Sequence, residues 1–290
     1  MNPNPVPREF STASGIRAWG ADQRAAGRRT AFVPTMGALH EGHLRLVDTA
    51  RALADAVVMS IFVNPLQFGP TEDLARYPRD LARDRALAGG RGVDALFVPD
   101  VSEMYPPGSA TRVVPGAAAE RWEGAARPGH FSGVLTVVAK LFHLVGPDVA
   151  VFGQKDAQQA ALIRQMVRDL DWPIALVVAP TVREADGLAL SSRNAYLSAE
   201  ERGQAVGLSR ALRAAHEAWA AGAADSTRLE ARAREVLAAF PGVLVEYISV
   251  VEPLALAPVP VAGAGCFMLV AARVGATRLI DNVIFGEGIA

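Results

Sequence analysis

The sequence predicts an α/β fold, because strand-like and helix-like segments alternate from about residue 30 to residue 180. Short apolar runs, typical of buried parallel strands, occupy residues 30–33, 56–63, 93–98, 149–152 and 174–179. Segments with apolar residues at helical spacing lie between or beside these runs, at residues 44–53, 80–88, 133–145 and 156–169. The alternation is typical of a doubly wound, Rossmann-like parallel sheet, which binds ligands beyond the carboxyl ends of its strands.

The pattern changes past about residue 182 and predicts a second, smaller α+β domain. Two segments rich in alanine and arginine, residues 199–222 and 226–239, are expected to be helices. Three strand candidates accompany them, at residues 244–251, 266–272 and 277–280. We therefore expect one domain over residues 1–181 and a lid domain over residues 182–290.

Composition limits the classes of function. The 290 residues carry a net charge of −1, so no basic surface for nucleic acid is expected. The single cysteine, Cys266, cannot form an intrachain disulfide, and its apolar neighbours predict a small core residue rather than a nucleophile. The first ten residues lack the apolar region of a secretory signal. Residues 253–272 are uncharged, but their prolines and glycines predict a loop feeding a strand rather than a membrane helix. We expect a cytoplasmic protein.

The most informative segment, residues 34–43, reads Pro-Thr-Met-Gly-Ala-Leu-His-Glu-Gly-His and joins the first apolar run to a helix. A helix start presents unpaired backbone N–H groups and a partial positive charge, which together favour an anion. The imidazoles of His40 and His43 add donors, and Gly42 leaves the backbone between them open to close approach. We interpret this turn as a phosphate site. Metal ligation and helix capping are the alternatives, but zinc would need a third ligand that no other histidine supplies at the usual spacing.

Two further clusters follow strands. Asn64 and Gln67 come after the run at residues 56–63, and their carboxamides suit hydroxyl and carboxylate recognition. Turn chemistry around Pro65 is the alternative, above all for Asn64. Lys155 follows the run at residues 149–152 and can neutralise a leaving pyrophosphate, while Gln159 lies three positions after Asp156, on the same side of the expected helix.

Lysine is rare, since 27 of the 29 basic residues are arginine. A genome-wide coding bias explains this skew without any function. A compact ammonium and a flat guanidinium are nevertheless not interchangeable near phosphate, which draws attention to Lys155. Lys140 is interpreted instead as an amphipathic side chain of a mostly buried helix. A polar loop at residues 180–194 contains two hydroxyls and a guanidinium at residues 191–193, which suit a lid over a polyphosphate. Alone this last signal is weak, because such loops are usually just solvated.

Together and in this order, the four motifs closely resemble those of the pantoate–β-alanine ligase family, the pantothenate synthetases of the nucleotidyltransferase superfamily. The resemblance covers residues 32–194 and continues more weakly to residues 277–282. It implies that ATP activates pantoate as pantoyl adenylate with loss of pyrophosphate, after which β-alanine displaces AMP and forms pantothenate. It also implies a homodimer that uses ATP and Mg²⁺.

The resemblance implies a role for each matching residue. The ATP-binding set is Met36, Gly37, Ala38, Leu39, His40, Glu41, Gly42, His43, Gly153, Gln154, Lys155, Asp156, Val182, Leu190, Ser191, Ser192 and Arg193. The catalytic set is His43 as the acid, His40 as its partner, and Lys155, Ser191, Ser192 and Arg193. Gln67 and Gln159 are expected to hold pantoate. Asn64, Tyr77 and Arg127 are candidates near the second substrate, and Asp84 near Mg²⁺. Leu190 and Ala157 depart from the family's usual methionine and aromatic residue.

Three rival functions remain at this point. An adenylyltransferase that leaves its nucleotide on a phosphorylated acceptor would share the histidine turn but would not need Gln67 and Gln159. A tRNA-charging enzyme is disfavoured by the near-neutral charge and by the lack of an evident anticodon-binding region. A non-catalytic nucleotide-binding module would bind ATP without turnover. Neither the phosphate-loop motif nor the dinucleotide fingerprint is present.

Overall fold

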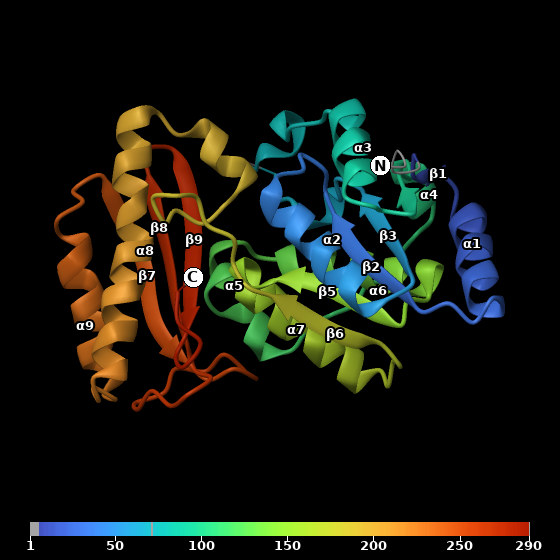
Figure 1. The fold of residues 1–290 in the computed structure, drawn as a ribbon. Coiled ribbons are helices and arrows are strands. Elements are labelled where there is room, and N and C mark those ends of the chain that lie inside the picture. The colour runs from blue at the N-terminus through green and yellow to red at the C-terminus, as the bar shows by residue number, and fades with distance from the viewer. Residues whose placement is uncertain (1–5, 71, 290) are drawn as a thin grey trace. The chain divides into compact units, whose positions relative to one another are not determined.

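The computed structural model describes residues 6–70 and 72–289 and divides into two compact units (Figure 1). Unit 1 comprises Met1–Gly153 and Leu162–Ala179, and unit 2 comprises Gln154–Ala161 and Pro180–Ala290. The chain thus passes between the units after Gly153, after Ala161 and after Ala179. The sequence pattern predicts only a single passage, near residue 181.

Unit 1 is built on a six-stranded sheet in the order β1-β4-β3-β2-β5-β6, and every neighbouring pair is parallel. The strands are β1 (Arg8–Phe10), β2 (Thr30–Thr35), β3 (Ala56–Ile61), β4 (Ala95–Phe97), β5 (Val149–Gly153) and β6 (Ala175–Ala179). The predicted doubly wound parallel sheet is confirmed. The sequence does not predict β1, because three residues are too few to show a periodic pattern.

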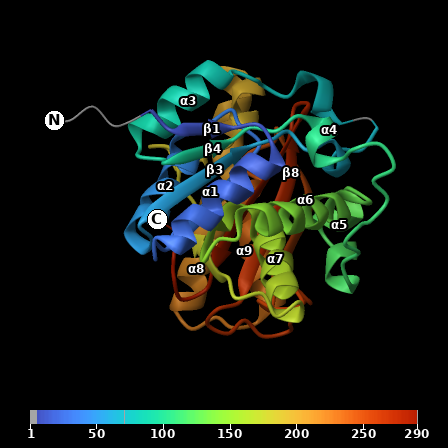
Figure 2. The same ribbon diagram turned by 90° about the vertical axis from the view of Figure 1, so that its right-hand side faces the viewer.

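Helices cover both faces of this sheet. The helices in this part of the chain are α1 (Ala13–Ala25), α2 (Glu41–Leu53), α3 (Leu81–Gly90), α4 (Val101–Met104), α5 (Glu123–Ala126), α6 (His130–Val145) and α7 (Ala157–Asp169). Short 3-10 turns are η1 (Pro65–Gln67), η2 (Asp73–Arg76), η3 (Ala117–Glu120) and η4 (Gln154–Asp156). Helices α1 and α6 pack on the face that Figure 2 presents, whereas α2 and α3 pack on the other.

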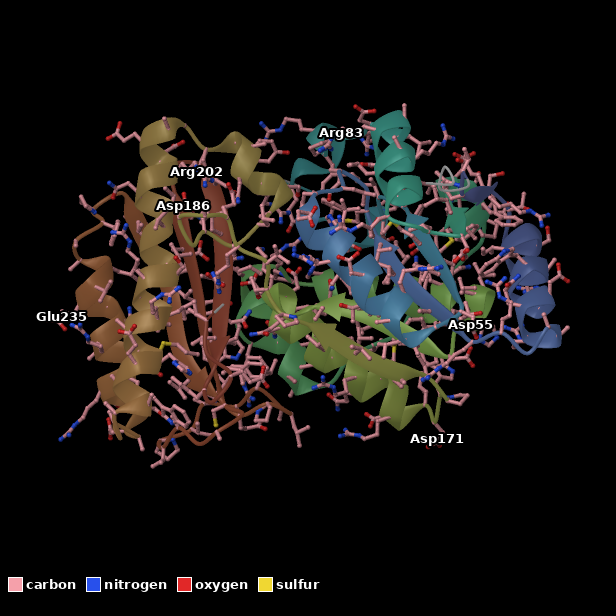
Figure 3. All side chains as sticks on the ribbon, in the orientation of Figure 1. Asp55, Arg83, Asp171, Asp186, Arg202 and Glu235 are labelled. Atoms are coloured by element: carbon pink, nitrogen blue, oxygen red, sulfur yellow. The ribbon has the colours of Figure 1, made fainter. Side chains whose placement is uncertain are left out.

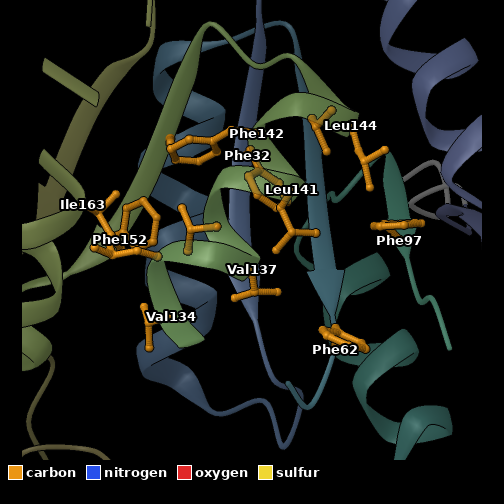
Figure 4. Packing of buried hydrophobic residues seen from close by; sticks show 14 of the residues in the cluster. Phe32, Phe62, Phe97, Val134, Val137, Leu141, Phe142, Leu144, Phe152 and Ile163 are labelled. Atoms are coloured by element: carbon orange, nitrogen blue, oxygen red, sulfur yellow. The ribbon is translucent and has the colours of Figure 1, made fainter. Parts of the chain in front are cut away.

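Alternation along the strands supplies the two cores of unit 1. Phe32 and Phe152 point to the side of α6 and meet Phe142 edge-on, with ring centroids 6.3 Å apart in both pairs (Figure 4). Val33 and Met59 belong to the opposite core, with residues of α2 and α3. Both faces of the sheet are therefore buried, as expected of parallel strands written as continuous apolar runs.

Unit 2 contains a three-stranded antiparallel sheet in the order β7-β8-β9. Its elements are β7 (Val243–Val251), β8 (Phe267–Val274), β9 (Thr277–Ile284), α8 (Ala199–Ala220), α9 (Ser226–Leu237) and the 3-10 turn η5 (Ser192–Tyr196). Leu208 and Leu212 of α8 and Leu229 of α9 pack with Val250 and Met268 in one core. The predicted smaller α+β domain is confirmed, and Cys266 is buried in this core as expected.

The uncharged stretch 253–272 is an irregular segment followed by β8. Over the part of the chain that the structure describes, every helix is too short or too polar to cross a bilayer. The prolines near the start of the chain fall mostly within residues 1–5, which lie outside the described residues.

Candidate active site

The histidine turn is a reciprocal helix cap. His40 is the N-cap of α2, and its Nδ1 accepts the Gly42 N–H at 3.1 Å. Nδ1 of His43 in turn accepts the His40 N–H at 3.3 Å. A ring nitrogen that accepts carries no proton, so both neutral imidazoles hold their proton on Nε2. The two rings lie against each other, with centroids 4.1 Å apart. One nitrogen of each ring thus builds the helix start, and the other is an N–H donor.

Asp84 fixes the backbone that precedes the histidines. This residue of α3 is 1% exposed, and its carboxylate accepts the N–H of Ala38 at 2.9 Å and of Leu39 at 2.8 Å. Both Gly37 (φ 83°) and Ala38 (φ 50°) are in the left-handed region, which is strained for alanine. A Cβ at Gly37 would also lie 2.9 Å from the Asp84 carboxylate. Arg83, labelled in Figure 3, donates to the Leu39 carbonyl at 3.1 Å.

These hydrogen bonds change which groups of the turn can donate to an anion. The N–H groups of Ala38 and Leu39 donate to Asp84 of α3, and those of His40 and Gly42 donate to the two histidine rings, because buried backbone donors must be paired. Since α2 begins at Glu41, the expectation of unpaired backbone donors at this helix start is wrong for Gly42. Donation to a phosphate at this turn would instead come mainly from the imidazole Nε2–H groups.

Asn64 and Gln67 form one hydrogen-bonded unit after β3. The Asn64 carboxamide donates to Gln67 Oε1 and to the Gly133 carbonyl, both at 3.1 Å. Its oxygen accepts the Tyr105 hydroxyl at 2.9 Å and the Leu66 N–H at 3.3 Å. Asn64 therefore has all its polar capacity engaged within unit 1 and orients Gln67. Gln67 Nε2 lies 3.1 Å from Met36 Sδ, which links the predicted pantoate residue to the predicted ATP segment.

The backbone carbonyl of Gln67 accepts hydrogen bonds from two further side chains. It accepts His130 Nδ1–H at 2.8 Å and an Arg127 N–H at 3.2 Å. Arg127 also grips the Glu72 carboxylate with two N–H groups, at 2.8 and 2.5 Å. This hydrogen bonding from Arg127 lowers the pKa of Glu72. Tyr77, five positions after Glu72, is buried, and its ring lies edge-on to that of Phe68.

His130 is neutral in this network. Burial lowers the pKa of His130 to about 4, and the nearby Arg127 charge acts in the same direction. The geometry requires this state, since Nδ1 donates to the Gln67 carbonyl and Nε2 accepts Arg127 Nη1 at 3.1 Å. The sequence motifs include neither Glu72 nor this role of His130. Each is a single polar residue more than 50 positions from its partner, so no local pattern marks it.

The predicted pyrophosphate segment is a 3-10 turn in unit 2. Gln154, Lys155 and Asp156 form η4, with Gln154 buried, Lys155 half-buried and Asp156 exposed. Gln159 follows, half-buried, on α7. Gly153 ends β5 in unit 1. Within the described ranges, the Lys155 ammonium has no carboxylate partner, so it can pair with an anionic ligand without breaking an ion pair.

The loop predicted to bind nucleotide is a short hairpin. Leu190 N–H donates to the Val182 carbonyl at 2.9 Å, and Arg183 pairs with Ala189 as an antiparallel bridge. Figure 3 labels Arg202 and Asp186, which form an ion pair at 2.7 Å; Arg202 also binds Glu184 at 2.8 Å. The hairpin leads directly into residues 191–193.

Residues 191–193 form the start of the 3-10 turn η5 rather than a freely solvated loop. Ser191 is the N-cap of η5 and accepts the Arg193 N–H at 3.3 Å. Ser192 and Arg193 are half-buried. By contrast, the ammonium nitrogen of Lys140, on α6, lies 5.7 Å from the centroid of the Tyr105 ring. This is in keeping with the predicted amphipathic role.

Hydrogen bonds join many of the predicted site residues of unit 1, whereas those of unit 2 lie mainly on two segments. Unit 1 brings together the histidine turn, Asp84, Asn64, Gln67 and Arg127. Unit 2 contains the Lys155 turn and the Val182–Leu190 hairpin with its serines and arginine.

Comparisons with known proteins agree with these motifs. The profile of the family described as Pantoate-beta-alanine ligase matches residues 8–284. A pantothenate synthetase of Acidobacterium capsulatum is 59% identical over 260 residues, which are 90% of this chain and 87% of that protein. One of Chloroflexus aurantiacus is 57% identical over 267 residues, covering 91% of this chain and 95% of that protein.

Solved structures extend the likeness to three dimensions. Pantothenate synthetase from Thermus thermophilus superposes with a TM-score of 0.90 at 51% identity, over 96% of this chain and 99% of that one. Pantoate-beta-alanine ligase from Francisella tularensis, complexed with beta-gamma ATP and beta-alanine, gives a TM-score of 0.80 at 32% identity, over 98% and 100% of the two chains. The chain belongs to the pantoate–β-alanine ligase family.

Proposed function

We propose that this chain condenses pantoate with β-alanine at the expense of ATP, and so makes pantothenate for coenzyme A biosynthesis. Membership of the family supports the reaction, and the Francisella tularensis relative was solved with an ATP compound and β-alanine. The structural observation that carries the proposal is the contact between Gln67 Nε2 and Met36 Sδ at 3.1 Å. It joins the carboxamide expected to hold an acid to the segment expected to hold the nucleotide.

In the first step, a pantoate carboxylate oxygen bonds to the α-phosphorus of ATP and pyrophosphate leaves. Such chemistry asks the protein mainly for positioning and for stabilisation of charge. The Nε2–H groups of His40 and His43 would donate to the phosphate oxygens, while Gln67 and Gln159 hold pantoate. Lys155, with Ser191, Ser192 and Arg193, would neutralise the departing pyrophosphate. In the second step, the β-alanine amine attacks the acyl carbon, loses a proton and displaces AMP.

Magnesium is proposed to arrive with the ATP phosphates rather than on a protein ligand set. Asp84 is poorly suited to bind a metal directly, because it is 1% exposed and its two carboxylate oxygens hold the backbone N–H groups of Ala38 and Leu39. Nowhere in residues 6–70 and 72–289 do three His, Cys, Asp or Glu side chains gather as metal ligands would. Magnesium bound mainly through substrate phosphates is common in such sites.

Three further features are proposed, the first from the resemblance and the other two from the sequence pattern and composition. The chain is expected to be a homodimer, which light scattering tests, and to work in the cytoplasm without nucleic-acid or membrane partners. Residues 182–290 are expected to act as a lid. Fluorescence transfer between labels on the two units, measured with and without ATP and pantoate, tests that role.

The decisive experiment supplies ATP, Mg²⁺ and pantoate first and adds β-alanine afterwards. We expect pyrophosphate with pantoate alone and AMP release only when both substrates are present. ATP binding without either product would indicate a non-catalytic module. Transfer of the nucleotide to a phosphorylated acceptor would instead favour the adenylyltransferase alternative.

A further inference from the structure

Strand β9 carries two adjacent buried polar residues to which the proposed reaction gives no role. Asp281 is 4% exposed and Asn282 is 2% exposed. Neighbouring residues of a strand point to opposite faces of the sheet, so the two side chains reach different segments. They belong to residues 277–282, the part of the resemblance to which no role was assigned from the sequence.

Asn282 binds the turn that presents Lys155. Its Nδ2 donates to the Gln154 carbonyl at 2.9 Å and to the Lys155 carbonyl at 3.1 Å. Its Oδ1 accepts Nε2 of the Gln154 side chain at 3.2 Å. One carboxamide thus satisfies two successive carbonyls of η4, and all these residues lie in unit 2. A buried pair of carbonyls left without donors would cost stability and let the turn shift.

Asp281 anchors the strand at this position. It pairs with Arg183 through two hydrogen bonds, at 2.6 and 2.9 Å, and these side chains are 3% and 6% exposed. The same carboxylate accepts the Asn282 N–H at 2.8 Å. Because Asp281 fixes the backbone of Asn282, the carboxamide has little freedom to move away from the Lys155 turn.

We propose that Asn282 is a positioning residue for the first half-reaction, acting through the backbone of Gln154 and Lys155. It does not touch the reacting atoms. It sets the direction in which the Lys155 ammonium is presented to the leaving pyrophosphate. This inference rests on the phosphate role proposed above for Lys155.

A double-mutant cycle between Asn282 and Lys155 tests the inference. Residues that act as a unit give non-additive effects, whereas independent residues give effects that multiply. Pyrophosphate release from ATP and pantoate measures the first half-reaction. AMP release from preformed pantoyl adenylate and β-alanine measures the second. We expect Asn282→Ala to slow the first half-reaction about 10- to 100-fold, a range typical of small displacements of a catalytic group. The second half-reaction should stay within about twofold, and Asn282→Ala should add little in a Lys155→Ala background.

Two controls separate positioning from loss of folding. Thr277→Val removes another buried polar group of β9, five positions away, and should leave both half-reactions unchanged. If Asn282→Ala does not fold, Asn282→Ser carries the test, since its hydroxyl can still donate to one carbonyl. Its effect should be smaller but equally confined to pyrophosphate release.

The outcomes distinguish this inference from the proposal on which it rests. If Lys155→Ala is slow and Asn282→Ala multiplies the defect, or if the Asn282 variant slows both half-reactions equally, the inference is wrong and the role of Lys155 stands. Normal pyrophosphate release by Lys155→Ala would remove the role of Lys155, and the inference with it.

Discussion

His40 and His43 each use one ring nitrogen to cap α2 and keep the other as a proton-bearing donor. The sequence leaves helix capping and phosphate binding as alternative interpretations of the histidine turn, and the use of separate ring nitrogens allows both. Capping and the proposed phosphate recognition do not compete, because they involve different atoms of the same ring. Capping through Nδ1 also selects the tautomer that has its proton on Nε2.

The substitution His43→Asn should separate the two roles. The oxygen of the introduced carboxamide would lie near the place of Nδ1 and could still accept the His40 N–H, so thermal unfolding should change little. Loss of the Nε2–H donor should slow pyrophosphate release about 100-fold or more, as for other lost transition-state donors. Calorimetry and single-turnover kinetics measure the two effects. A large drop in melting temperature with near-normal chemistry would instead make His43 a structural residue.

Asp84→Asn should slow catalysis without changing the magnesium requirement. An amide can accept only one of the two backbone N–H groups and points its NH₂ at the other, so the strained Ala38 should relax. We expect pyrophosphate release to fall about tenfold or more. Asp80→Ala is the matched control, since Asp80 caps the same helix through the Arg83 N–H. It should cost about 1 kcal/mol of stability and no activity. Recovery of the Asp84 variant at high Mg²⁺ would identify Asp84 as a metal ligand.

Because His130 is buried in its neutral form, we expect acid to lower the free energy of unfolding. Burial lowers its pKa to about 4 from the ordinary 6.5, so between these values the unfolded chain binds a proton that the folded chain does not. The free energy of unfolding should therefore fall as the pH drops from 6.5 to 4, by at most about 3 kcal/mol. His130→Asn can still donate to the Gln67 carbonyl but does not titrate.

Denaturant unfolding at several pH values measures this slope. The His130→Asn variant should lose part of it, whereas His143→Asn, at an exposed histidine of the same helix, should keep it. Equal slopes in the wild type and both variants would show that His130 is not the group responsible.

Among the elements, α6 and η1 approach so closely that only glycine fits between them. A Cβ at Gly133 would overlap the Leu66 carbonyl and lie 2.7 Å from the Gln67 N–H nitrogen. The Gly133 carbonyl also accepts the Asn64 carboxamide at 3.1 Å. The helix thus sets the position of the turn that carries Gln67.

Gly133→Ala should accordingly impair pantoate binding. The added methyl pushes η1 away from α6, so we expect the KM for pantoate to rise about tenfold and stability to fall by about 1–3 kcal/mol. Gly203→Ala in α8 is the control, because a Cβ there meets nothing within 4 Å. It should stabilise the protein by up to about 1 kcal/mol. An unchanged KM for pantoate in the Gly133 variant would contradict the idea that α6 positions Gln67 for pantoate binding.

Sequence patterns predicted elements better than the contacts between them. The apolar runs found β2 to β6, yet α6 begins at His130, three residues before the predicted start, after Gly129 turns the chain in a left-handed conformation (φ 81°). Helix α1 was missed because it buries only Ile16, Trp19 and Gly20, too few for a clear period. The partners of Gln67 and Gln154 could not be predicted, since His130 and Asn282 lie 63 and 128 positions away from them.

For the whole molecule, three passages of the chain between units mean that neither unit is one continuous segment. Helix α7 has its first five residues in unit 2 and the rest in unit 1. A fragment of residues 182–290 would lack Gln154 and Lys155, leaving the buried Asn282 carboxamide without the acceptors it has in the full chain.

We expect that fragment not to melt cooperatively, whereas the full chain should unfold in a single transition. Unsatisfied buried groups cost about 1–3 kcal/mol each, a large part of a small domain's stability. Circular dichroism melts of both samples measure this. A sharp melt of the fragment would show that residues 182–290 fold independently.

The distance along the chain between Gln154 and Asn282 also has a consequence for synthesis. At ribosomal rates of about 5–20 residues per second, the 128 positions between them take on the order of ten seconds to translate. During that interval the turn that bears Lys155 has emerged, but the carboxamide that binds its two carbonyls does not yet exist. If Asn282 positions Lys155 as proposed, a nascent chain that already has the histidine turn and its lysine still lacks the geometry proposed to bind pyrophosphate. Competence for the first half-reaction would then arise late in translation.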